Sequence, residues 1–208
     1  MTHTDIINSL ITRYGYKSYL EIGLDTGTNF MRINCDNKYS VDPYFHNNND
    51  AIRSDAQIPD CLTWRMTSDE MFGTVAKEML FDIIFIDGMH TEEQAAKDIV
   101  NSLKHLNKGG KIVVHDCLPA SYEAQLVPRI QGEWNGDVWK AVAMLPKLGI
   151  GFSVVDTDYG CGVIEWFDGS EKLTEIPKCT MTYQEMVSDK TNIMHVIDEN
   201  MFVEKYLK

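Results

Sequence analysis

Apolar residues follow a helical spacing at the start of the chain and then gather into short runs between polar segments. The spacing of Ile6, Leu10 and Tyr14 predicts an opening helix within residues 1–15, with Gly15 at its end. Five short apolar runs predict strands over residues 18–23, 38–42, 62–66, 81–86 and 111–114. The run 81–86 is apolar almost throughout, which is typical of a strand covered on both faces.

Helical patterns alternate with these strands over residues 68–80, 91–106 and 137–148. Two further strands, 152–155 and 162–166, predict an antiparallel hairpin, and residues 183–207 have a weak helical pattern. This alternation predicts a three-layer, Rossmann-like α/β fold, with a mostly parallel sheet and an antiparallel C-terminal hairpin. We expect a single domain over residues 1–208, made of an opening helix (1–15), a core (18–166) and a helical C-terminal appendage (167–208).

The composition limits which binding partners and which cellular compartment are expected for the protein. Lys and Arg total 19 against 31 Asp and Glu, so the formal charge is −12 and nucleic acid is not an expected partner. Five cysteines without a C-x-x-C pair favour free thiols over a zinc ribbon or a disulfide framework. The apolar runs are shorter than a membrane span and the polar start is unlike a signal peptide, so we expect a cytoplasmic protein without a membrane partner.

Glycines and an acid follow the first two predicted strands, at the edge where open parallel sheets bind ligands. Gly23 and Gly27 let a ligand lie against the backbone. Asp42 ends the second strand, where a carboxylate can accept both hydroxyls of a ribose, so an adenosine-type ligand is favoured over a purely structural turn and loop cap. Asp25, with Glu21, disfavours a pyrophosphate and favours a cationic or zwitterionic ligand.

Acids and histidines follow the next two strands. Asp87 and His90 lie three residues apart on a turn, so one can bind metal or substrate while the other accepts a proton. His115 and Asp116 end the neighbouring strand, about 4.8 Å away, so carboxylates from both strands can converge on one cation. If Asp116 alone faces the crevice, magnesium suits the site; if His115 also binds, manganese, iron or zinc fits. The alternative is a structural role, in which the Asp116 carboxylate accepts hydrogen bonds from backbone amides of a loop.

These residues together resemble the class I S-adenosylmethionine-dependent methyltransferases. Glu21-x-Gly23-x-x-x-Gly27 is similar to the first motif of that family, and Asp42 is similar to its ribose-binding acid. Three further segments resemble the small metal-dependent O-methyltransferases, which include the macrocin-type sugar enzymes. These segments are Phe85-Ile86-Asp87-Gly88-Met89-His90, Lys108-Gly109-Gly110 and His115-Asp116. The likeness covers residues 19–119 and extends weakly to about residue 165.

The resemblance implies methyl transfer from S-adenosylmethionine to a small-molecule hydroxyl, first of all that of a sugar or another diol. It implies that the cofactor is bound by Glu21, Gly23, Asp25, Gly27, Asp42, Thr67, Ser68 and Asp87. It further implies a divalent metal, Mg²⁺ or Mn²⁺, held by Asp87 and Asp116 with His115 as a further candidate. The expected catalytic residues are His90, as general base, and Asp87, because a metal lowers the hydroxyl pKa while the base takes the proton.

Two other functions fit part of the pattern. An NAD-dependent dehydrogenase needs a pyrophosphate-compatible loop, against which Asp25 argues, and a non-catalytic module that binds an adenosine ligand is the second alternative. Several aromatic residues are candidates for an acceptor wall, although aromatics are more often core: Tyr122, Trp134, Trp139 and Tyr159. Phe45 and His46 are candidates for covering the cofactor. The C-terminal methionines, Met181, Met186, Met194 and Met201, are expected in the core or in a homo-oligomer contact.

Overall fold

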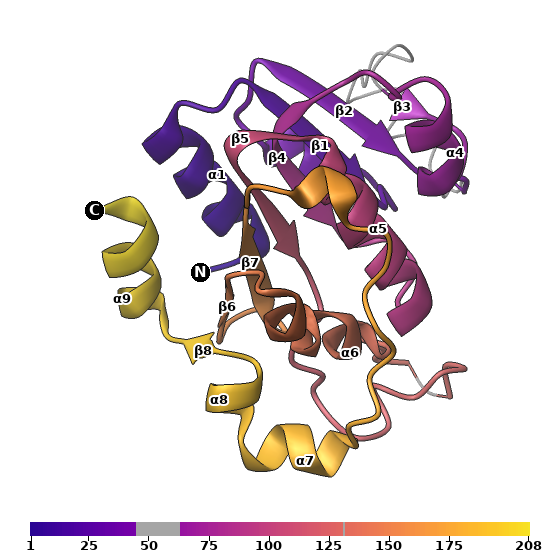
Figure 1. Ribbon diagram of the computed structural model, residues 1–208, viewed down its shortest axis with the longest axis vertical. Helices are drawn as coiled ribbons and strands as arrows, with labels where there is room; N and C mark the ends of the chain where they lie inside the picture. Colours follow the sequence, from indigo (N-terminus) through magenta and orange to yellow (C-terminus); the bar gives the residue numbers. More distant parts are fainter. Residues whose placement is uncertain (45–62, 131) are drawn as a thin grey trace.

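A computed structural model describes residues 1–44, 63–130 and 132–208 and contains an eight-stranded sheet in the order β3-β2-β1-β4-β5-β7-β6-β8 (Figure 1). Strands β1 to β5 run parallel, β7 is antiparallel to both β5 and β6, and β8 is parallel to β6. The strands are β1 Ser18–Ile22, β2 Asn37–Val41, β3 Thr63–Trp64, β4 Phe81–Ile86, β5 Leu106–Val114, β6 Phe152–Val155, β7 Cys161–Glu165 and β8 Val196–Ile197. The predicted fold class, with its antiparallel hairpin, is confirmed.

Helices cover both faces of this sheet. They are α1 His3–Tyr14, α2 Thr28–Arg32, α4 Ser68–Gly73, α5 Glu92–Lys104, α6 Val138–Ala143, α7 Tyr183–Ser188, α8 Lys190–Ile193 and α9 Glu199–Phe202. Shorter turns are the 3₁₀ segments η2 Leu145–Leu148 and η3 Ser170–Lys172 and the π-helical segment η4 Val203–Leu207. Each layer of the predicted three-layer arrangement is therefore present.

Local signals explain where the two longest helices begin and end. Thr2 caps α1 in a capping box with Asp5, and Gly15 ends it in the left-handed conformation with φ of 67°. Thr91 caps α5 by accepting a hydrogen bond from the Gln94 amide. These contacts satisfy backbone groups that the helix ends would otherwise leave unpaired.

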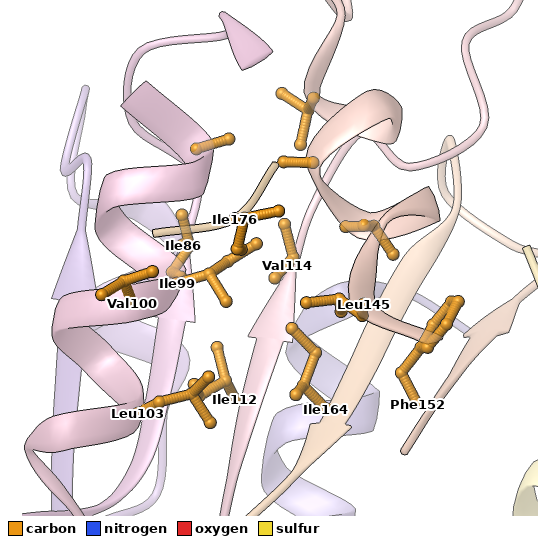
Figure 2. Packing of buried hydrophobic residues seen from close by; sticks show 14 of the residues in the cluster. Ile86, Ile99, Val100, Leu103, Ile112, Val114, Leu145, Phe152, Ile164 and Ile176 are labelled. Carbon is orange, nitrogen blue, oxygen red and sulfur yellow. The ribbon is translucent and has the colours of Figure 1, made fainter. Parts of the chain in front are cut away.

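Alternating strand residues build two separate cores. On one face, α4, α5 and α6 pack against residues such as Ile84, Ile86 and Val114. Figure 2 shows side chains from α5, η2, β4, β5, β6 and β7 meeting there. On the other face, α1, α2 and α9 pack against Ile83 and Phe85, the neighbours of those residues in β4. Burying each such side chain stabilises the fold by about 1.5–3 kcal/mol. A shift of one residue in the pairing of β4 would move these side chains to the opposite face of the sheet, so the register of this strand is strongly specified.

Several predicted element limits are wrong. Helix α4 ends at Gly73 instead of residue 80, because Gly73, Thr74 and Val75 have low helix propensity. Helix α5 ends at Lys104, since Leu106 already begins β5. The helix over 137–148 is divided at Met144 and continues as a 3₁₀ turn that contains Pro146.

The C-terminal segment also differs from its predicted helical pattern. It consists of short helices interrupted by β8, which pairs with β6 and so belongs to the sheet. The β-branched pair Val196 and Ile197 suits such an edge strand. Of the C-terminal methionines, Met186 and Met194 are buried in the core, whereas Met201 is 52% exposed. Phe45 and His46 lie outside the described residues.

Candidate active site

A cleft of about 850 Å³ opens at the carboxyl ends of β1, β2, β4 and β5. Most of the residues predicted from the sequence line it: Gly23, Asp25, Asp42, Thr67, Ser68, Asp87, His90, His115 and Asp116. Its opposite wall carries residues of the loop after β5, namely Arg129, Glu133, Trp134 and Asn135. The parallel part of the sheet therefore brings together residues that are more than 90 positions apart in the sequence.

Gly23 sits where β1 and β4 end side by side. Its φ is 90°, and a Cβ atom at this position would lie 2.0 Å from the carbonyl oxygen of Asp87. Only glycine fits such a close approach of two backbones. Gly27, with φ of 75°, begins α2 and does not line the cleft, so its role here is to turn the chain into the helix.

The Asp42 carboxylate holds residues 23–27, named here the glycine loop, in place. Oδ2 accepts hydrogen bonds from the amides of Leu24 (2.8 Å) and Asp25 (3.2 Å), and Oδ1 accepts one from the amide of Tyr44 (2.8 Å). The structural role considered from the sequence is therefore present. An ionised carboxylate offers about four acceptor positions, so one remains unused by these three hydrogen bonds, and Asp42 lines the cleft.

Glu21 does not face the cleft, in contrast to its predicted contact with the cofactor. Its side chain is 2% exposed and accepts hydrogen bonds from the Tyr19 hydroxyl and from Asn29 Nδ2, the latter at 2.9 Å. Burial raises the pKa of Glu21 to about 8 despite these hydrogen bonds. The reason is strand alternation, which sends Glu21 to the same face as Tyr19, against α2.

A hydrogen-bonded group that the sequence interpretation missed lies beside Ser68. The Ser68 hydroxyl donates to Asp98 Oδ1 at 2.5 Å, and Gln94 Nε2 donates to the same oxygen at 3.2 Å. Asp98 is 1% exposed yet lines the cleft, and burial raises its pKa to about 6. An acid among the inward positions of α5, between Ala95 and Ile99, was the signal that could have identified it. Thr67 caps α4 at the same edge.

Asp87, His90 and Asp116 form a compact group, named here the acidic rim. His90 Nε2 lies 3.3 Å from Asp87 Oδ1, and His90 Nδ1 lies 3.1 Å from Asp116 Oδ2. One ligand atom from each residue lies within 4.8 Å of the other two, close enough to surround one metal ion. Desolvation lowers the pKa of His90, but the two carboxylates outweigh it and hold that pKa above its ordinary value.

The backbone at Asp116 is held in an uncommon conformation. Its φ is 61°, in the left-handed region, and its Oδ1 accepts a hydrogen bond of 2.6 Å from Asn135 Nδ2. Asn135 in turn accepts a hydrogen bond from the amide of Ala120, so the carboxylate is fixed by the loop after β5. Strain of this kind is typical of functional sites.

His115 only partly joins the acidic rim. Its Nδ1 lies 3.4 Å from Asp87 Oδ1 and 3.6 Å from Asp116 Oδ1, but its ring is turned toward α1, where it meets His3. Its Nε2 lies 3.7 Å from Asp158 Oδ1. Both histidines lie near both acids, but His90 is closer to each of them than His115 is. Neither His3 nor Asp158 was identified as a site residue from the sequence.

Two of the four candidate aromatic residues reach the cleft. Trp134 stacks on His90 with ring centroids 5.2 Å apart, and its backbone carbonyl lies 3.1 Å from His90 Nδ1. Tyr159 lines the cleft and donates a hydrogen bond of 2.6 Å to Glu133. Trp139 is fully buried in the core, and Tyr122 packs against Tyr183 outside the cleft.

Comparison with known proteins finds a family model that matches part of the chain. Residues 20–117, which contain the glycine loop and the acidic rim, match a family model described as a methyltransferase domain. This part of the chain is a methyltransferase domain. The match confirms the predicted resemblance to methyltransferases and the prediction of an enzyme. No curated protein matches the sequence.

Solved structures with the same fold include several methyltransferases. An O-methyltransferase from Bacillus cereus in complex with SAH has a TM-score of 0.54 at 15% identity, over 79% of this chain and 80% of that chain. The SAH-bound methyltransferase PaMTH1 from Podospora anserina has a TM-score of 0.53 at 17% identity, over 77% and 76%. The O-methyltransferase TomG from Streptomyces achromogenes, in complex with SAM, has a TM-score of 0.51 at 16% identity, over 79% of each chain.

Within the described residues, none of the helices of this methyltransferase combines the length and the apolar character needed to cross a membrane. The described cysteines, Cys35, Cys117, Cys161 and Cys179, are free thiols, whereas Cys61 lies outside the described residues.

Proposed function

We propose that this methyltransferase transfers the methyl group of S-adenosylmethionine to a hydroxyl oxygen of a small molecule, with a sugar or another diol as acceptor and a divalent cation at the acidic rim. The observation that carries the proposal is one cleft lined by two chemically different groups of residues. Gly23 and Asp42 form one group, and Asp87, His90 and Asp116 form the other, directly beside it. A cleft of about 850 Å³ is within the range of small-molecule sites.

The cofactor end suits a nucleoside with a positively charged sulfonium. Asp42 has acceptor capacity left for ribose hydroxyls, and the exposed Asp25 adds negative charge near the loop. Asp98 and Ser68 present polar atoms at the cleft floor, where an adenine amino group can be received. The same acids disfavour a dinucleotide, since its pyrophosphate would meet Asp25 and Asp42.

The donor set of the acidic rim fits a hard divalent cation. Asp87 and Asp116 supply carboxylate oxygens, which Mg²⁺ and Mn²⁺ prefer, and Asn135 fixes Asp116 from behind. When bound there, such a cation would lower the pKa of an acceptor hydroxyl. His115, with Nδ1 facing both carboxylates, is a further candidate ligand.

His90 is proposed as the general base that takes the hydroxyl proton. Trp134 covers one face of its ring and fixes its orientation, and the side chain remains 23% exposed toward the cleft. The two carboxylates beside it stabilise the imidazolium that forms when the proton arrives. The chain's contribution is then to align the acceptor oxygen, the methyl carbon and the sulfur in one cleft.

Charge and thiol content support the remaining parts of the proposal. The formal charge of −12 favours a small acceptor over nucleic acid, and the free thiols of the described cysteines favour the reducing cytoplasm. The side chain of the C-terminal methionine Met201 is 52% exposed. We include in the proposal that it contacts a second copy of the chain.

The test is a transfer assay on purified, metal-stripped protein. Formation of S-adenosylhomocysteine is followed with S-adenosylmethionine, Mg²⁺ and a panel of free sugars, nucleotide sugars and catechols. Mg²⁺-dependent transfer to a hydroxyl of one panel member supports the proposal. Tight cofactor binding with no turnover across the panel favours a binding module, and hydride transfer with NAD in place of S-adenosylmethionine would contradict the proposal.

A further inference from the structure

A second group of metal-ligating side chains lies behind the acidic rim, on the α1 side of the sheet. It consists of His3 at the start of α1, His115 after β5 and Asp158 in the turn between β6 and β7. Strand alternation explains why His115 points there: Val113 belongs to the core under α1, so the side chain two residues on faces the same way. His3 and Asp158 do not line the cleft.

The three side chains converge closely. His3 Nδ1 lies 2.6 Å from Asp158 Oδ2, His115 Nε2 lies 3.7 Å from Asp158 Oδ1, and the two imidazole rings meet edge to face with centroids 4.8 Å apart. One ligand atom from each residue lies within 4.8 Å of the others. Ligand atoms 2.0–2.1 Å from a tetrahedral ion are about 3.3 Å apart. Around an ion the 2.6 Å distance between His3 and Asp158 would therefore lengthen, and the 3.7 Å distance between His115 and Asp158 would shorten.

One nitrogen atom of this group has no hydrogen-bond partner among the described residues. Within the described part of the chain, His115 Nε2 is buried and makes no hydrogen bond, since the 3.7 Å to Asp158 exceeds hydrogen-bond distance. A buried polar atom without a hydrogen bond destabilises the folded state unless a ligand or an ion satisfies it. A metal ion between His115 Nε2 and Asp158 Oδ1 would remove this destabilisation.

We propose that His3, His115 and Asp158 bind a second divalent ion of the zinc type, separate from the cation of the acidic rim. Two imidazoles and one carboxylate suit Zn²⁺, whereas Mg²⁺ prefers oxygen ligands alone. The side chains of His3 and Asp158 are each 23% exposed, which leaves an entry path and a fourth position for water. The ion ties the N-terminal helix to the hairpin beside the acidic rim.

The test measures zinc binding by tag-free full-length protein, in excess Mg²⁺ to occupy the acidic rim. Titration with Zn²⁺ is expected to give one tight site per chain, and Co²⁺ in its place is expected to give the visible absorption of a tetrahedral N/O complex. His3→Ala and Asp158→Asn are expected to weaken zinc binding at least 100-fold and to abolish the Co²⁺ spectrum. His105→Ala, a histidine at the far end of α5, is the matched control and should bind as the unaltered protein does.

Thermal unfolding provides a second readout. Zn²⁺ should raise the Tm of the unaltered protein, by mass action on the folded state, and this rise should be absent in His3→Ala. Zinc affinity that is unchanged in a folded His3→Ala protein would overturn the proposal, as would zinc binding that is lost in Asp116→Asn but kept in His3→Ala. Because neither cofactor nor acceptor is present, the result is independent of whether the protein methylates a hydroxyl.

Discussion

The imidazole of His90 bridges two carboxylates, with Nε2 3.3 Å from Asp87 and Nδ1 3.1 Å from Asp116. Asp87 follows β4 and Asp116 follows β5, two neighbouring parallel strands, so one side chain connects the ends of both. Although desolvation alone would raise it, the contacts with His115 and His90 hold the pKa of Asp87 below its ordinary value. The rim is therefore a network in which each charge depends on the others.

Replacing His90 by Ala should lower kcat about 10²- to 10⁴-fold, which is the usual contribution of a general base. The dissociation constants of S-adenosylmethionine and Mg²⁺ should change less than about threefold, because the proposed role of His90 is to move a proton. Turnover assays and calorimetry measure the two effects, with His105→Ala as control. A parallel loss of Mg²⁺ affinity would identify His90 as a metal ligand instead.

Replacing Asp42 by Asn should weaken cofactor binding about 10- to 100-fold. The change removes one charged acceptor, and a hydrogen bond to a charged group contributes about 1.5–3 kcal/mol. Calorimetric titration with S-adenosylmethionine measures the loss, and Asp168→Asn, an exposed acid on a distant loop, serves as control. If the dissociation constant of S-adenosylmethionine does not change, Asp42 does not bind the cofactor. Its role would then be only to hold the glycine loop through its hydrogen bonds.

Removal of divalent cations should abolish methyl transfer while cofactor binding persists. Chelation with EDTA should stop turnover, and Mg²⁺ or Mn²⁺ should restore it in the unaltered protein. Asp116→Asn should not be rescued by Mg²⁺, because one carboxylate of the rim is gone. Asparagine tolerates the left-handed φ of 61° at this position, so the substitution tests the charge and leaves the backbone intact. Full activity after chelation would contradict a metal-dependent mechanism.

Glu21 should make the fold less stable as the pH rises. Its pKa is about 8 in the folded protein and about 4.3 in an unfolded chain, so between these values only the folded state retains the proton. The free energy of unfolding should therefore fall with pH by up to about 1.4 kcal/mol per unit over this range and level off above pH 8. Urea unfolding at pH 5.5, 6.5 and 7.5 measures the slope.

The matched variants for this effect are Glu21→Gln and Glu171→Gln. Glutamine keeps the shape and the acceptor oxygen at position 21 but cannot ionise, so its variant should show a flatter profile than the unaltered protein. Glu171 is exposed, and its replacement should leave the slope as it was. An identical slope in all three proteins would assign the pH dependence to other groups.

Much of the fold and of the cleft could be predicted from the sequence because both follow local rules. Apolar runs bounded by glycine or acid specify strands, and the residue after each strand end in a parallel sheet faces the same edge. Asp42, Asp87 and Asp116 were found in this way and do line one cleft. Thr91 and Gly15 likewise mark helix ends through their own chemistry.

The features that could not be predicted from the sequence depend on side-chain direction and on contacts between distant parts of the chain. Glu21 belongs to a motif, but strand alternation places it with Tyr19 on the face away from the cleft. His3 meets Asp158 across 155 positions of sequence, a contact that no local pattern encodes. Asp98 could not be identified from the sequence, because a single acid on the apolar face of a helix looks like an ordinary interruption of the hydrophobic pattern.

The close approach of Gly23 to the Asp87 backbone limits how this enzyme can diversify. Because the backbone of Asp87 and Gly88 already fills the space for any side chain at position 23, the glycine loop and the acidic rim can change only together. Variation in the shape of the cleft therefore has more room among Arg129, Glu133 and Tyr159, which line the same cleft from loops rather than from the sheet.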